Sequence, residues 1–274
     1  MAPWTGVVLA LREPESEPLG SRLSTYLHPL AGRPLAWHPV HALASLAPAP
    51  ARVLVAGGHD LVPELFADVP GEVRLTDSLA DALAAAEGRV LVLDGAAPLA
   101  TPALAPLLES DGDALLEGSD GETVAAWLGP EGLARLVNPS GDLRLLREAL
   151  PGAPVLRDTD AFAVHTREGL ARASSTIRDR LVRRLMEGGV TFLLPEAVMV
   201  DVDVLIGRDT IVYPWCVLEG KTTIGEETVI GPCCRIDSCW IGSGVELKGF
   251  NYLSHTSIRN RAILEPYVRR GFDE

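Results

Sequence analysis

Few residues in this sequence have the types and spacing that chemistry requires. His38 and His41 lie three positions apart, a spacing that places two imidazoles on one face of a helix, where they could bind a metal ion. The pattern offers them no third ligand, so an ordinary helix surface is the better interpretation. Cys233, Cys234 and Cys239 lack the C-x-x-C spacing of a metal or redox site, and we interpret them as structural side chains.

The balance of charge excludes several classes of partner. The 274 residues include 24 basic and 37 acidic side chains, a formal net charge of −13, which repels nucleic acids and anionic lipids. Only two of the basic residues are lysines, Lys221 and Lys248, so lysine-dependent chemistry is excluded from the N-terminal part. The sequence contains neither a signal peptide nor an apolar run of about 18 residues. We therefore expect a cytoplasmic protein that does not bind membranes.

Short β-rich runs alternate with helical runs through the N-terminal half. This alternation is typical of βαβ units and a mostly parallel sheet. The expected strands are Gly6–Leu11, Arg52–Ala56, Val73–Leu75 and Val90–Leu93, and the expected helices are Pro34–Leu46, Leu61–Phe66, Leu79–Ala86 and Thr101–Leu108. Further along we expect strands at Ala114–Leu116 and Thr123–Trp127 and helices at Pro130–Val137 and Leu143–Leu150.

A six-residue repeat decides the architecture of the C-terminal region. After a predicted connecting helix between Arg167 and Gly188, aliphatic residues recur every six positions. They are Val200, Ile206, Val212, Leu218, Ile224, Ile230 and Ile236, followed after one five-residue step by Ile241, Leu247 and Leu253. Three hexapeptides form one triangular coil with aliphatic side chains on its axis. We therefore predict a left-handed parallel β-helix of nearly four coils, and domains at 1–165 (α/β), 166–198 (connecting helix and linker) and 199–274 (β-helix).

This order of parts resembles the bacterial bifunctional N-acetylglucosamine-1-phosphate uridyltransferase/glucosamine-1-phosphate acetyltransferase (GlmU) family. The amino-acid sequence is similar to that of the family at Leu27–Val40, Val90–Leu104 and Ala163–Ala173, and the similarity is greatest at Leu185–Gly242. The resemblance implies a shortened α/β nucleotidyltransferase-like (Rossmann-like) domain, a connecting helix and a left-handed parallel β-helix. In that family the first domain transfers a uridylyl group with Mg²⁺.

The positions that carry this chemistry in the family hold other residues here. The phosphate-binding loop of the family falls on Leu9–Leu19, where three glutamates and two prolines oppose a triphosphate. Its lysine falls on Thr25, its metal-binding aspartate on Ala96 and its metal-binding asparagine on His165. Asp94 is a possible substitute ligand, but a two-residue shift moves a side chain about 7 Å along a strand. We therefore predict no catalytic residue, no metal site and no cofactor.

Other features still predict binding. The resemblance ends at Leu264–Arg270, before the later coils that carry the family's catalytic histidine and acetyl-CoA groove. A residual pocket is expected at the carboxyl ends of the strands, near Ala10, Thr76 and Gly95, since that crevice is a property of the fold. Because it lacks cations, we expect it to prefer an uncharged or weakly charged ligand.

Aromatic residues gather in the C-terminal region. Counting three hexapeptides per coil places Trp215, Cys233, Phe250 and Tyr267 in one column on an outer face. An exposed apolar column is typical of an interface. The resemblance implies a homotrimer through the β-helix, and we predict that this column contributes to its contact.

The leading hypothesis is a catalytically degenerate GlmU-like protein with a binding, regulatory or scaffolding role in amino-sugar or cell-envelope metabolism. Beyond its own copies, a protein partner or a nucleotide sugar is its candidate partner. Two alternatives stay open. One is an active but divergent nucleotidyltransferase that makes UDP-N-acetylglucosamine or a related nucleotide sugar with Mg²⁺. The other is an acyltransferase completed by a partner subunit.

Overall fold

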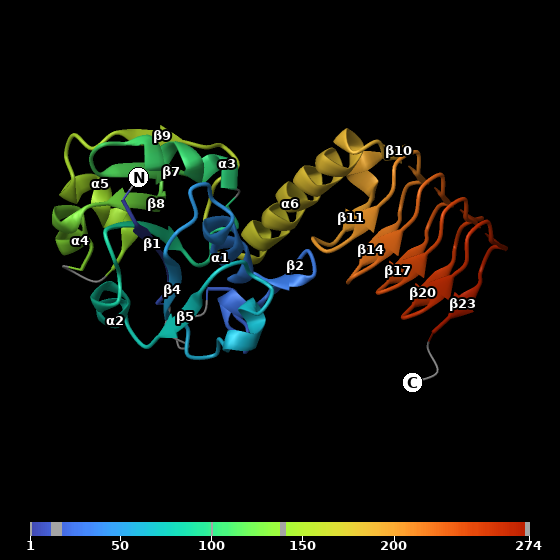
Figure 1. Cartoon of the computed structure of the whole chain (residues 1–274), viewed down its shortest axis with the longest axis horizontal. Coiled ribbons are helices and arrows are strands. Elements are labelled where there is room, and N and C mark those ends of the chain that lie inside the picture. Colours follow the sequence, from blue (N-terminus) through green and yellow to red (C-terminus); the bar gives the residue numbers. More distant parts are fainter. Residues whose placement is uncertain (1, 12–17, 100, 138–140, 272–274) are drawn as a thin grey trace. The chain divides into compact units, whose positions relative to one another are not determined.

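The structure is a computed structural model that describes residues 2–11, 18–99, 101–137 and 141–271. The chain forms two compact units, Met1–Pro29 with Pro34–Ala171, and Leu30–Arg33 with Arg172–Glu274. The first contains an α/β sheet and the second a β-helix (Figure 1). The domain boundaries expected at residues 165 and 198 stay a prediction. None of the helices described is both long and apolar enough to cross a membrane.

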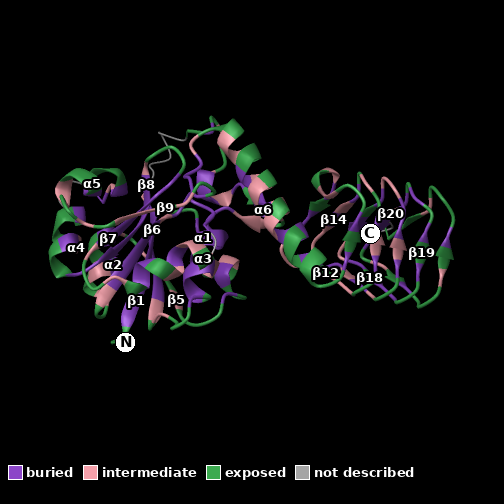
Figure 2. Ribbon diagram, turned by 90° about the horizontal axis from the view of Figure 1, so that it is seen from above, coloured by how far each residue is buried: buried purple, intermediate pink, exposed green. Residues whose placement is uncertain are grey.

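The first unit is built on a seven-stranded sheet with the order β5-β4-β1-β6-β8-β7-β9. Its strands are β1 (Trp4–Ala10), β4 (Arg52–Gly57), β5 (Val73–Thr76), β6 (Arg89–Asp94), β7 (Ala114–Glu117), β8 (Thr123–Leu128) and β9 (Val155–Arg157). The neighbours β5, β4, β1 and β6 are parallel, whereas β8 is antiparallel to both β6 and β7. All seven residues of β1 are buried (Figure 2), as expected for a central strand that is covered on both faces.

The helices around this sheet are short. They are α1 (Trp37–Ala44), α2 (Leu79–Ala84), α3 (Thr101–Leu104), α4 (Pro130–Val137) and α5 (Leu146–Ala149), with 3-10 turns η2 (Thr25–Leu27), η3 (Pro63–Phe66), η4 (Ala105–Glu109) and η5 (Leu143–Leu145). At the start of α2 the Ser78 hydroxyl accepts a hydrogen bond from the Asp81 amide at 3.2 Å. This is an N-cap that the sequence places directly before the apolar run.

The expected strands of this unit are present, but three expected helices differ. Leu61–Phe66 is reduced to η3, and Thr101–Leu108 and Leu143–Leu150 are each divided between a 3-10 turn and a short α-helix. Proline in the first turn of η3 and of η4 removes an N–H donor at those points. The strands β9, β2 (Pro29–Leu30) and β3 (Arg33–Pro34) were not predicted, because runs of two or three residues carry no readable period.

The order of the parallel strands locates a crevice. Four parallel strands lie side by side in the order β5, β4, β1 and β6. In the order of the chain these are the third, second, first and fourth of the four. This is the order of a Rossmann-like half-sheet, in which ligands bind at the carboxyl ends of the strands where the order reverses. Here it reverses between β1 and β6, where Leu9 pairs with Asp94.

The longer segment of the second unit begins at Arg172, within helix α6 (Arg167–Glu187). The bounds of α6 nearly coincide with those of the predicted connecting helix. Ile177, Leu181 and Leu185 are buried on one stripe, as the spacing predicts. Val182 and Leu185 belong to the hydrophobic core of the β-helix, so the end of α6 covers part of its axis.

Three parallel sheets form the sides of the β-helix, in the orders β10-β13-β16-β19-β22, β11-β14-β17-β20-β23 and β12-β15-β18-β21. The strands are β10 (Thr191–Phe192), β11 (Met199–Val200), β12 (Leu205–Ile206), β13 (Ile211–Val212), β14 (Val217–Glu219), β15 (Thr223–Ile224), β16 (Val229–Ile230), β17 (Arg235–Asp237), β18 (Trp240–Ile241), β19 (Glu246–Leu247), β20 (Tyr252–Ser254), β21 (Ser257–Ile258), β22 (Ile263–Leu264) and β23 (Arg269–Arg270), with η6 (Pro195–Ala197) in the first coil. The predicted fold class, an α/β domain followed by a connecting helix and a left-handed parallel β-helix, is confirmed. Strand β10 lies before residue 199, where we expected the β-helix to begin.

The core of the β-helix follows the six-residue period. The axial side chains of Val212, Leu218, Ile230 and Ile236 are 0% exposed. Cys216 occupies a corner, where it is buried and its thiol donates to the Gly231 carbonyl oxygen at 3.2 Å. The four cysteines are free thiols, consistent with structural packing.

Candidate functional site

A cavity opens at the point where the strand order reverses in the α/β unit. It has a volume of about 300 Å³ and is lined by Leu9, Leu11, Pro18, Tyr26, Asp94, Gly141, Asp142, Leu143, Arg144 and His165. Leu9 and Leu11 come from the end of β1, and Asp94 ends β6. Tyr26 lies in η2, and Leu143 and Arg144 lie in η5. The other lining residues come from the loop before η2, the loop between α4 and η5, and the segment between β9 and α6. The fold therefore places a polar cavity where Rossmann-like sheets bind ligands.

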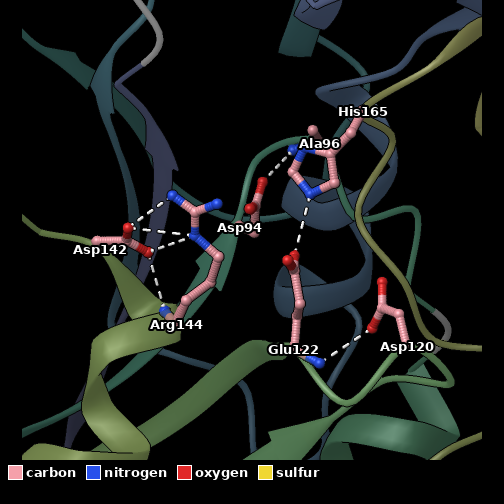
Figure 3. A network of polar contacts seen from close by, with 7 residues as sticks. All are labelled: Asp94, Ala96, Asp120, Glu122, Asp142, Arg144 and His165. Carbon is pink, nitrogen blue, oxygen red and sulfur yellow. Dashed lines mark hydrogen bonds and ion pairs between the residues drawn. The ribbon is translucent and has the colours of Figure 1, made fainter.

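The end of β6 holds Asp94 in a fixed turn. Its Oδ1 accepts a hydrogen bond from the Ala96 amide at 2.7 Å (Figure 3), and the Ala97 amide donates to the Asp94 carbonyl oxygen at 3.0 Å. Between these residues, the Gly95 amide donates a hydrogen bond to the Leu9 carbonyl oxygen at 2.9 Å. A Cβ at Gly95 would lie 2.7 Å from that oxygen, so only glycine permits this approach.

The structure brings together the three positions that replace family residues. Ala96 is buried, and its carbonyl oxygen accepts the Val164 amide at 2.9 Å, which places Ala96 next to the segment that carries His165. The imidazole Nε2 of His165 lies 3.2 Å from Glu122 Oε2. Thr25 is buried in η2 next to Tyr26, which lines the cavity. Of the three, His165 lines the cavity, whereas Thr25 and Ala96 are buried beside lining residues.

The three predicted pocket residues are less close to one another. Ala10 and Gly95 flank Leu9 and Asp94, which line the cavity. Thr76 ends β5, two strands away from β1, or about 10 Å at the usual strand spacing. Its hydroxyl donates to the carbonyl oxygens of Val55 and Ser78 at 3.2 Å, so it stabilises the β5–α2 turn. The loop Arg12–Glu17 lies outside the described residues.

An ion pair that the sequence did not predict forms one wall of the cavity. The Asp142 side chain accepts from the Arg144 amide at 3.0 Å and caps η5. The same carboxylate holds the Arg144 guanidinium, with Nε–Oδ1 at 2.9 Å and Nη2–Oδ2 at 2.7 Å (Figure 3). This hydrogen bonding lowers the pKa of Asp142. It also raises the pKa of Arg144, and Glu122 and Asp94 add to that effect through their charges.

The described lining of the cavity has more carboxylates than permanent cations. Among the described lining residues, Arg144 is the sole permanent cation, and it forms an ion pair with Asp142. Asp94 adds a second carboxylate. Carboxylate oxygens accept hydrogen bonds from hydroxyl and amide groups but repel phosphates. Such a lining suits a neutral polar ligand.

A second feature lies on the β-helix, at the corner between its first and second sheets. Trp215, Cys233, Phe250 and Tyr267 each have a positive φ, between 54° and 66°, and occupy equivalent places in successive coils. Phe250 and Tyr267 stack with ring centroids 5.3 Å apart and an interplanar angle of 25°. Trp215 is 65% exposed and Tyr267 is 74% exposed. We call these four residues the corner column; Trp215, Phe250 and Tyr267 are exposed and Cys233 is partly buried.

Comparison with known proteins relates the β-helix to hexapeptide transferases. Residues 203–238 match the family described as "Bacterial transferase hexapeptide (six repeats)". The bifunctional protein GlmU of Geobacillus sp. (strain WCH70) is 40% identical over 117 residues, which cover 42% of this chain and 25% of that protein. GlmU of Alkaliphilus oremlandii (strain OhILAs) is 38% identical over 109 residues, covering 40% and 24%. The C-terminal part of this chain is GlmU-like.

The GlmU matches span about a quarter of the relatives' own length. Solved structures resemble the chain more distantly. Rv0371c from Mycobacterium tuberculosis H37Rv is 20% identical with a TM-score of 0.48, covering 64% of this chain and 99% of that chain. The inositol-1-phosphate CTP transferase from T. maritima is 12% identical with a TM-score of 0.47, covering 64% and 97%. We draw no functional conclusion from these two similarities.

Knowledge of the GlmU-like pattern did not reveal Asp142, Arg144 or Glu122, because this part of the chain resembles the family poorly. The sequence carried a local signal for Asp142, since an aspartate directly before the apolar run that starts at Leu143 is a favoured N-cap residue. It carried none for Glu122, which is 43 positions from His165 in the chain. Within the described residues, no group of three or more His, Cys, Asp or Glu side chains is arranged to hold a metal ion.

Proposed function

We propose that this GlmU-like protein has lost nucleotidyl transfer and binds an uncharged or weakly charged ligand in the cavity at the carboxyl ends of β1 and β6. One observation carries the proposal: Asp142 neutralises Arg144, while Asp94 leaves the cavity with an excess negative charge. The bound ligand would give the protein a regulatory or scaffolding role, and amino-sugar or cell-envelope metabolism is the context that its relatives suggest.

The charges in this cavity oppose a nucleoside triphosphate. A phosphate about 4 Å from Asp94 would be repelled by roughly 4 kcal/mol at an effective dielectric constant of about 20, which corresponds to about a thousandfold in affinity. A sugar or another polyol meets no such repulsion, and its hydroxyl groups can donate to Asp94 and Asp142. The same lining that excludes UTP therefore accepts a neutral sugar.

Magnesium, which the family uses, does not fit the residues at the corresponding positions. Ala96 offers no side-chain ligand, and His165 offers a nitrogen, whereas Mg²⁺ prefers oxygen. The Asp94 Oδ1 already accepts the Ala96 amide at 2.7 Å. One observation favours the alternative of a divergent nucleotidyltransferase, namely that Asp94 and Asp142 line the same cavity.

Thermal shift measurements test the ligand preference. We expect N-acetylglucosamine to stabilise the chain more than UTP with Mg²⁺ does, because the sugar carries no charge. Asp94→Asn removes one negative charge without changing the side-chain shape, and should strengthen UTP binding by up to about a thousandfold, the full size of the repulsion at about 4 Å. Asp111→Asn changes the net charge equally at an exposed residue that is not among those lining the cavity, and should leave both ligands unaffected. UTP with Mg²⁺ as the strongest stabiliser of the unmodified chain would contradict the proposal.

We also propose that the chain forms a homotrimer through its β-helix, with the corner column in the contact. Burial of an aromatic side chain contributes about 2 kcal/mol or more, whereas a glutamate at the same place would bury an unpaired charge. Light scattering is therefore expected to show a trimer that dissociates in Trp215→Glu and Phe250→Glu. Trp240→Glu is the control, because Trp240 is 50% exposed but lies outside the column. A trimer that survives both substitutions would exclude the column from the contact, and a monomeric unmodified chain would exclude the trimer.

A further inference from the structure

The base of the β-helix, where its first coil begins, is open on one of three sides. The axial residues Phe192 of β10 and Val200 of β11 are 5% and 3% exposed, so two sides are closed. Ile206 holds the equivalent place on the third side and is only partly buried. In the following coils the same place is filled by isoleucines that are fully enclosed, namely Ile224, Ile241 and Ile258 at 2%, 0% and 2% exposure.

A groove of about 660 Å³ lies over this opening. It is lined by Arg184 and Leu185 of α6 and by residues 202–207, with Ile224 beneath them. Leu205, on the outer face of β12, is 61% exposed. The groove is therefore largely apolar and reaches the axis of the β-helix at the place where a further axial side chain would sit.

The edge of β12 faces this groove with backbone groups. β12 is the edge strand of its sheet and pairs with β15 on one side. The amides of Leu205 and Gly207 donate to the carbonyl oxygens of Thr222 and Ile224. Because successive peptide groups of a strand point in opposite directions, the Val204 carbonyl and both backbone groups of Ile206 point toward the groove. They form the edge to which a parallel strand can add.

We propose that this groove binds an extended segment of a partner protein by strand addition. The segment would donate two backbone N–H groups to Val204 and Ile206 and accept one from Ile206, the pattern by which each coil joins the next. Between the two donors its side chain would enter the axis, where every later coil places isoleucine. A β-branched aliphatic residue therefore fits this position.

Charged residues at the edge of the groove indicate which charge the bound segment should carry. Asp203 is paired with Arg33 at 2.7 Å. Arg184 is exposed, and no described residue pairs with it. A partner segment with an acidic residue shortly after its β-branched residue would complement Arg184 while its backbone completes the sheet.

A labelled peptide that copies residues 221–227 has this composition, with one isoleucine followed by glycine and two glutamates. Fluorescence anisotropy with the full chain is expected to show saturable binding. N-methylation of its glycine removes the donor to Ile206 and should weaken binding about tenfold, the effect of losing one or two hydrogen bonds. N-methylation of its isoleucine is the matched control, since that amide points away from β12, and should change binding by less than about twofold.

Two protein variants test the charge at the rim. Arg184→Glu is expected to weaken binding of the peptide. A version of the peptide with lysines in place of its glutamates should bind the unmodified chain weakly and bind Arg184→Glu more tightly. Arg183→Glu, an exposed neighbour on α6, should do neither. Equal losses from both N-methylated peptides would overturn strand addition. Absence of saturable binding, which is expected if a second copy or another part of this chain fills the groove, would overturn the proposal as a whole.

Discussion

Pyrophosphate release from UTP and N-acetylglucosamine-1-phosphate is expected to remain at the level of a protein-free control. The lysine, aspartate and asparagine positions of the family hold Thr25, Ala96 and His165. In the structure, Ala96 is buried and His165 lies 3.2 Å from Glu122. None of the three side chains supplies the permanent positive charge or the Mg²⁺-binding oxygen that the resemblance implies at these positions.

The size of the expected loss follows from the number of groups replaced. Removal of one well-placed charge-stabilising group typically lowers kcat by about 10² to 10³. Such losses are not additive, but three replaced groups in one site still leave a rate at least about 10⁴ below that of a competent enzyme. Thiol release from acetyl-CoA with glucosamine-1-phosphate should stay at background as well.

The decisive control is Asp94→Ala, measured at several Mg²⁺ concentrations. Among the residues that the structure describes, Asp94 and Asp142 are the carboxylates that line the cavity. They are the oxygen donors that a divergent nucleotidyltransferase would use. Activity in the unmodified chain that depends on Mg²⁺ and disappears in Asp94→Ala would establish relocated metal binding. It would also replace the proposed binding function with the divergent enzyme. Asp111→Ala serves as the matched substitution away from the cavity.

The sequence predicted the β-helix well because its physical cause is local and periodic. A coil of three hexapeptides places one aliphatic residue on each side of the axis, so the spacing of Val212, Leu218 and Ile224 already specifies the register. In the structure, Val212 pairs with Ile230 and Leu218 with Ile236. The corner column follows from the same count, since residues one coil apart occupy the same corner.

The polar wall of the cavity was harder to predict because its contacts join distant segments. His165 meets Glu122 across 43 positions, and the Ala96 carbonyl meets Val164 across the sheet. These pairs exist only when β6, β8 and the segment after β9 are assembled. Sequence reasoning identified the crevice from the alternation of strands and helices, which is a property of the fold, but not the charges that surround it.

Ile230→Ala is expected to lower the free energy of unfolding of the β-helix by about 2 to 5 kcal/mol. Ile230 is 0% exposed and lies on the axis between Val212 and Leu247. The coils cannot close the space left by the lost methyl groups, because the Tyr213 amide bonds to the Ile230 carbonyl oxygen at 2.9 Å and the Gly231 amide to that of Leu247 at 2.8 Å.

The matched control is Ile263→Ala, which removes the same atoms from a side chain that is 61% exposed and should change stability by less than about 0.5 kcal/mol. Hydrogen exchange resolved by segment is the appropriate measurement, since it reports on each unit separately. Neighbouring coils stabilise one another in a repeat fold, so protection should fall across β13 to β22 in Ile230→Ala while the strands of the α/β unit keep theirs. Equal losses in the two variants would show that the axial column does not dominate the stability of the β-helix.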